Sequence, residues 1–134
     1  MTANYKRIAV ANAVLQAIGS HGRKFFYSKE NDRFAAFILD TVGGLRLVDD
    51  WSGKAVRLTE HGRWRGFSHG GTCRAMVWAL AKYIRHGTPM PRGHFGPWTQ
   101  WRSDGDVWGY GPEEMEQVRA RVFASPAVEP SKGD

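Results

Sequence analysis

The sequence contains a single cysteine and no long apolar run. Cys73 alone excludes an internal disulfide, and its place among apolar residues at helical spacing predicts a buried, inert thiol. No stretch approaches the ~20 apolar residues of a membrane span. The first residues, Met1 to Arg7, also lack the apolar core of a signal peptide. We therefore expect a cytoplasmic protein that does not engage a membrane.

Acidic side chains are almost missing from the middle of the chain. Residues 54–102 contain nine basic side chains and one acidic side chain, Glu60, whereas residues 103–134 contain three basic and seven acidic ones. The net charge of the whole chain is +6. Because a positive segment attracts polyanions, this distribution favours a nucleic acid or an acidic complex as the partner.

Aromatic residues are abundant, at 13% of the chain, and six of them are tryptophans. The 134 residues are enough for one domain with a substantial core. Exposed tryptophan is unfavourable, so the rings either fill the core or form a binding surface. The sequence alone leaves both interpretations open.

The hydrophobic pattern predicts an α+β fold. Short runs of aromatic and branched residues separated by polar, Gly-bearing turns are typical of an antiparallel meander of four strands. Apolar residues at a spacing of about 3.6 predict an N-terminal helix and a main amphipathic helix packed on the sheet. The expected strands lie at 23–27, 34–39, 45–49 and 55–58, and the expected helices at 4–18 and 72–86.

The main helix should have Thr72 as its N-cap and should end at Gly87. It is followed by a Trp/Gly/Pro-rich loop at 88–111 and a short C-terminal helix from Pro112. We expect a single domain over residues 1–124 and a disordered tail over 125–134, because the tail has little to bury.

The junction before the main helix is the strongest candidate for binding. A glycine-rich turn that enters a helix leaves backbone N–H groups available to an anion, and neighbouring arginines add positive charge. Arginines that neutralise phosphates and rings that stack on bases are what single-stranded nucleic acid binding requires. The alternative is a turn followed by a solvated basic face, with the rings in the core. The predicted nucleic-acid or partner-binding residues are Arg63, Trp64, Arg65, Ser68, His69, Gly70, Gly71, Arg74, Lys82, Arg85, Arg92, Trp98, Trp101 and Arg102.

Catalytic and metal motifs are weak. Ser68 and His69 are adjacent, but adjacency does not create the geometry of a triad. Asp49 and Asp50 could hold a hard cation, although aspartates at turns commonly bind the local backbone. No two histidines have the spacing of a helical metal pair, and there is no CxxC motif. The sequence therefore predicts no catalytic residue, no metal and no cofactor, and it favours a protein that is not an enzyme.

Three blocks of the chain resemble a pattern in small uncharacterised proteins of bacteriophages, prophages and plasmids. They are Val48–Lys54, which contains Trp51-Ser52-Gly53-Lys54; Trp64–Thr72, which reads Trp-Arg-Gly-Phe-Ser-His-Gly-Gly-Thr; and Tyr83–Gly87, which reads Tyr-Ile-Arg-His-Gly. The resemblance implies a mobile-element context and assigns no role to any residue. Accessory proteins of mobile elements often block host defence or process nucleic acid. This link to function is an association and not a physical argument.

Three functions follow as hypotheses. The first is a non-catalytic accessory protein that binds nucleic acid or a host nucleic-acid-handling complex, including as an anti-CRISPR-type inhibitor of host defence. The second is a protein–protein inhibitor anchored by Trp98 and Trp101, since tryptophan is enriched at interface hot spots. The third is a small enzyme, which would require one pocket that unites Ser68 and His69 with the Asp49/Asp50 pair. The oligomeric state stays open.

Overall fold

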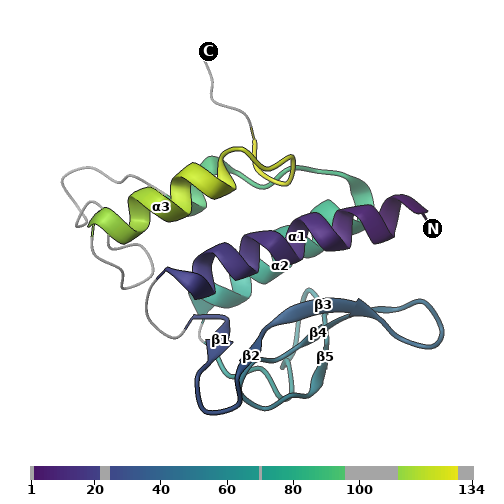
Figure 1. Cartoon of the computed structure of the whole chain (residues 1–134). Coiled ribbons are helices and arrows are strands. Elements are labelled where there is room, and N and C mark those ends of the chain that lie inside the picture. Colours follow the sequence, from purple (N-terminus) through teal and green to yellow (C-terminus); the bar gives the residue numbers. More distant parts are fainter. Residues whose placement is uncertain (1, 22–24, 70, 96–111, 130–134) are drawn as a thin grey trace.

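The computed structural model describes residues 2–21, 25–69, 71–95 and 112–129. Within them, the helices form one layer stack above two small antiparallel sheets, and the C-terminal helix lies on the side away from the strands (Figure 1). This confirms the predicted α+β class. None of the described helices combines the length and the apolar character needed to cross a membrane.

Helix α1 (Thr2–Ser20) lies at the centre of the fold. It contacts α2 (Gly71–His86), α3 (Pro112–Val122) and the strands β1 to β3. Because neighbours cover several of its sides, its buried residues do not form one narrow stripe. They include Ala11, Val14, Leu15, Ala17 and Ile18.

The strands form two sheets instead of one four-stranded meander. Strands β1 (Tyr27–Ser28) and β2 (Arg33–Phe34) form a small hairpin, while β3 (Ala36–Leu39), β4 (Leu45–Val48) and β5 (Ala55–Arg57) form the predicted meander. The predicted strand at 34–39 is interrupted at Ala35, whose N–H donates to the carbonyl of Phe26 at 2.8 Å. Phe26 is buried and adopts a positive φ of 62°, a conformation that disfavours regular pairing there.

Asn12 connects α1 to the edge of the meander. Its Oδ1 accepts from the Phe37 N–H at 2.6 Å, and its Nδ2 donates to the Phe37 carbonyl at 3.2 Å. The side-chain amide thus bonds both backbone groups of one β3 residue. This pair fixes the sheet against the helical layer.

Helix α2 buries the apolar face that the sequence predicts. Cys73, Met76, Leu80 and Ile84 are all at most 2% exposed. Burial, and secondarily the nearby charge of Asp50, raises the pKa of the Cys73 thiol to about 12, so this cysteine stays protonated and inert.

The ends of α2 differ in how well they were predicted. The helix begins at Gly71, so Thr72 lies in its first turn and does not precede the helix as an N-cap. Gly87, with a φ of 79°, confirms the predicted stop, and its N–H donates to the carbonyl of Tyr83 at 2.7 Å.

The C-terminal segment is ordered further than the sequence suggests. After α3, Ala127 and Val128 are buried. Met90 donates to the carbonyl of Ala127 at 2.7 Å and accepts from the Glu129 N–H at 2.9 Å. Residues 127–129 therefore pair with Met90, in the segment after α2, within the stretch 125–134 where the sequence predicts a disordered tail. Residues 96–111, which hold most of the predicted Trp-rich loop, lie outside the described residues, and the short 3-10 helix Arg92–Phe95 precedes them.

Candidate functional site

Asp49, at the end of β4, ties two loops together. Its Oδ2 accepts from the backbone N–H groups of Trp51 and Ser52 at 3.0 and 2.9 Å. Its Oδ1 accepts from the N–H and the hydroxyl of Ser68 at 2.8 and 3.0 Å. With 0% exposure, this carboxylate is compensated by four donors, as a buried charge requires.

A second set of contacts holds the same loops at Gly66. The Ser52 hydroxyl donates to the Gly66 carbonyl at 2.6 Å. Gly66 has a φ of 91°, and a Cβ there would lie 3.0 Å from the Cβ of Lys54. Only glycine accommodates both the backbone conformation and this close approach. The turn after β4 and the segment before α2 therefore form one unit.

Within this unit, His69 forms a short bond to Asp50. Its Nε2 lies 2.7 Å from Oδ1 of Asp50, and the side chains are 12% and 3% exposed. We assign a proton to Nε2, because a carboxylate oxygen can only accept a hydrogen bond. The Phe26 N–H also lies 3.4 Å from this nitrogen, at the long end of the hydrogen-bond range.

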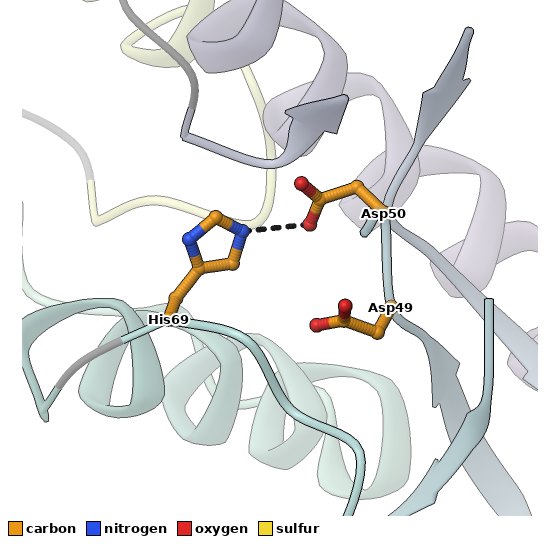
Figure 2. Close-up of side chains that lie close together, drawn as sticks. All are labelled: Asp49, Asp50 and His69. Atoms are coloured by element: carbon orange, nitrogen blue, oxygen red, sulfur yellow. Dashed lines mark hydrogen bonds and ion pairs between the residues drawn. The ribbon is translucent and has the colours of Figure 1, made fainter. Parts of the chain in front are cut away.

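The other ring nitrogen of His69 is directed away from both aspartates. Figure 2 shows Nε2 facing Asp50 and Nδ1 on the opposite side of the ring. Nδ1 has no hydrogen bond to any residue in the described part of the chain. In the tautomer that carries its only proton on Nε2, Nδ1 is an available acceptor. The rings of Phe26 and Phe67, at centroid distances of 5.3 and 5.7 Å, hold the imidazole in place.

One pocket beside His69, here called the aromatic pocket, has a volume of about 700 Å³. This lies within the range of small-molecule sites. The Tyr27 hydroxyl donates to Asp32 at 2.8 Å, and this bond raises the pKa of Tyr27, so the phenol stays neutral. The pocket is lined by Phe25, Tyr27, Ser28, Glu30, Asp50, Trp51, Ser68 and His69.

A second pocket, here called the arginine pocket, has a volume of about 680 Å³ and also includes His69. Trp64 forms its base: the ring is 6% exposed, and its Nε1 donates to the Thr59 carbonyl at 2.8 Å. The guanidinium of Arg74 lies 4.5 Å from the centre of that ring. The pocket is lined by Arg63, Trp64, Arg65, Gly66, Phe67, His69 and Arg74.

Three guanidinium groups gather at the arginine pocket. Among the described residues, no carboxylate oxygen lies within 4.0 Å of Arg63, Arg65 or Arg74. Arg63 and Arg65 are exposed, and Arg74 extends from the first turn of α2, where backbone N–H groups lack helical partners. Like charges that gather without a counter-ion favour a bound anion.

Comparison with known proteins gives the family. The model of the YoqU family matches residues 2–125. The chain belongs to this family. It is 30% identical over 119 residues to the SPbeta prophage-derived uncharacterized protein YoqU of Bacillus subtilis (strain 168), covering 87% of this chain and 79% of that protein. No solved structure matches. The predicted resemblance to small prophage proteins is thereby confirmed.

In this YoqU-family chain, the pockets unite part of the predicted binding set. Arg63, Trp64, Arg65, His69 and Arg74 share the arginine pocket, and Ser68 lines the aromatic pocket next to it. Gly71 begins α2 at their edge. Trp64 is buried, so its ring supports Arg74 and has no free face for a base.

The remaining predicted residues lie elsewhere or outside the described residues. Arg85 lies with its guanidinium 5.7 Å from the ring of Trp78 and donates to the Leu58 carbonyl at 3.5 Å. Lys82 is exposed on α2, and Arg92 stacks on the ring of Phe123 at 3.8 Å. None of these three lines either pocket. Gly70, Trp98, Trp101 and Arg102 lie outside the described residues.

Sequence reasoning missed the aromatic pocket. Phe25 and Tyr27 looked like parts of an ordinary strand, and Glu30 like part of a polar turn. Trp51 was the available signal, because a large ring between Asp50 and Ser52 in a polar turn has no core to enter; it is 56% exposed. The positive φ of Phe26, directly beneath His69, is a second sign of a specialised site, but only coordinates show it.

The aspartates and His69 do not fit a metal ion. One donor atom from each of Asp49, Asp50 and His69 can be chosen within 4.8 Å of the others. However, the Asp49 oxygens already accept four hydrogen bonds, and Nε2 of His69 donates to Asp50. A ligand must present a free lone pair to the metal. Asp49 acts here as a structural clamp.

Proposed function

We propose that this protein binds nucleic acid through the arginine pocket, without catalysing a reaction on it. The observation that supports this is the meeting of Arg63, Arg65 and Arg74, without a carboxylate partner among the described residues, beside the first turn of α2. Guanidinium groups form bidentate bonds to phosphate oxygens, and a helix N-terminus adds backbone donors and a favourable dipole.

The rigidity of the pocket supports the same proposal. Arg74 is held over the Trp64 ring, and the segment that carries Arg63 and Arg65 is clamped through Gly66 and Ser68 to the turn after β4. A preorganised cationic pocket loses less conformational entropy on binding than free arginine side chains would. This is a better anion site than a solvated basic face.

The family context supports a mobile-element role for this binding. The relative named above is prophage-derived. We extend the proposal to an accessory protein that acts on nucleic acid or on a host complex that handles it, as an anti-CRISPR-type inhibitor of host defence would. A strand, and a host complex with its nucleic acid bound, both present phosphates that the arginine pocket would bind.

A salt titration tests the proposal. A labelled 20-nucleotide single strand is titrated with the protein, and its affinity is measured by fluorescence anisotropy at 50 and 200 mM salt. Three phosphate contacts predict a loss of roughly 15- to 20-fold over this range, because each contact releases counterions. An affinity that is unchanged by salt, or no binding at 50 mM, would contradict the proposal.

A second candidate function is a small enzyme, and the hydrogen bond between His69 and Asp50 favours it. Asp50 orients the ring through Nε2, which leaves Nδ1 free to take a proton from water. The attacking oxygen would bond to phosphorus, the ester P–O bond would break, and the leaving oxygen would regain the proton from His69. The guanidinium groups next to His69 would stabilise the charge that develops on the phosphate.

A cleavage assay distinguishes this candidate from binding alone. Labelled single-stranded RNA and DNA are incubated with the protein between pH 5 and 8, with and without His69→Gln. If the protein is an enzyme, the unmodified protein cleaves the strand. His69→Gln should then lower the cleavage rate at least 100-fold, while strand binding persists. Intact strands throughout the pH range would eliminate it and leave the binding function.

A further inference from the structure

The two pockets carry opposite charges and meet at His69, which lines both. The aromatic pocket contains the carboxylates of Asp50 and Glu30. The arginine pocket contains three guanidinium groups. A ligand that fills both pockets therefore needs an anionic group at one end and an uncharged ring with hydrogen-bond donors at the other.

We propose that one nucleotide with an amino-bearing base fills both pockets, its phosphate on the arginines and its base in the aromatic pocket. This inference rests on the proposed binding of nucleic acid and specifies which part of the strand is read. Trp51 supplies the stacking surface, because its ring is 56% exposed at this pocket. Stacking of a base on such a ring is a main source of affinity for unpaired nucleotides.

The choice of base follows from Asp50. Its Oδ1 is occupied by His69, whereas Oδ2 has no donor among the described residues. A carboxylate oxygen only accepts hydrogen bonds, so it favours a base with an exocyclic amino group as donor. Guanine, adenine and cytosine carry such a group, while uracil has carbonyl oxygens instead, and its single N3–H lies between two of these oxygens, which repel a carboxylate. The carboxylates also keep the phosphate out of this pocket and direct it to the arginines.

Calorimetric titration separates the contribution of the base from that of the phosphate. The full chain is titrated at 50 mM salt with guanosine 5′-monophosphate, uridine 5′-monophosphate and ribose 5-phosphate. We expect the guanosine nucleotide to bind at least about tenfold tighter than ribose 5-phosphate, which lacks only the base, and about tenfold tighter than the uridine nucleotide.

Two variants assign the binding to the pockets. Trp51→Ala should lower the affinity for the guanosine nucleotide several-fold, towards that for ribose 5-phosphate, and leave the sugar phosphate unaffected. Tyr5→Ala is the matched control, since this ring is 63% exposed on α1 and lines neither pocket, and it should change nothing. Arg63→Glu should weaken both ligands alike.

The outcomes separate this inference from the function on which it rests. Equal affinity for the guanosine nucleotide and ribose 5-phosphate would overturn the inference, and salt-dependent strand binding would still stand. Nucleotide binding that survives Arg63→Glu would also overturn it, because the phosphate would then lie elsewhere. If the unmodified protein does not bind the strand at all, the proposed function itself is contradicted.

Discussion

Reversing the charge of Arg63 and Arg65 together, as Arg63→Glu/Arg65→Glu, lowers the affinity for a single-stranded oligonucleotide by roughly 100-fold or more at 50 mM salt. Both side chains are exposed and line the arginine pocket. Their replacement removes two phosphate contacts and places two carboxylates against the backbone of the strand. The measurement is fluorescence anisotropy, with circular dichroism to verify the fold.

The control is a double variant with the same change in net charge. Lys6 and Arg57 are exposed and line neither pocket. Lys6→Glu/Arg57→Glu should therefore lower the affinity for the strand only a few-fold, as expected from the lower overall charge. Equal losses in the two double variants would show that net charge and not the arginine pocket attracts the strand.

Asp49→Asn should destabilise the protein by about 3 kcal/mol, a fall in Tm of roughly 10 °C. Oδ2 accepts from the N–H groups of Trp51 and Ser52, and Oδ1 from Ser68. Asparagine has only one side-chain oxygen, so its amide nitrogen would replace one of the two accepting oxygens. That nitrogen would face N–H donors, and its own hydrogens would have no acceptor. Since the carboxylate is fully buried, water cannot compensate.

Asp40→Asn provides the comparison in a similar turn. Asp40 accepts from the N–H groups of Val42 and Gly44 at 3.0 and 2.7 Å, and these bonds hold the pKa of its carboxyl below the usual value. It lies between β3 and β4 and is better solvated, so we expect a clearly smaller fall in Tm by differential scanning calorimetry. Equal falls would mean that Asp49 does not clamp the two loops.

Asp49→Asn should in addition weaken strand binding, because it releases the loop that carries Arg65.

Local pattern was sufficient to predict much of the fold. The spacing of Cys73, Met76, Leu80 and Ile84 predicted α2, and Gly87 predicted its end. The interruption at Ala35 was beyond local reasoning, since it depends on the conformation of Phe26 nine residues earlier. Ala127 and Val128 are only two apolar residues in a polar segment, and Met90 could not be identified as their partner from sequence.

The site was predicted in part. The cluster of Arg63, Arg65 and Arg74 followed from proximity in the sequence and from the predicted helix start. The contact between Asp50 and His69 spans 19 residues and exists because Asp49 clamps the intervening loops together. Side chains of that separation meet only through tertiary structure, so the sequence pattern did not predict the aromatic pocket.

The bonds between Asn12 and Phe37 have a consequence for how molecules of this protein meet. β3 is an outer strand of its sheet, and such a strand exposes backbone groups that can recruit a strand from another chain. The Asn12 amide occupies both the N–H and the carbonyl of Phe37, in the middle of β3. A strand of another molecule therefore finds no free backbone partner at Phe37, because the Asn12 side chain of α1 already occupies it.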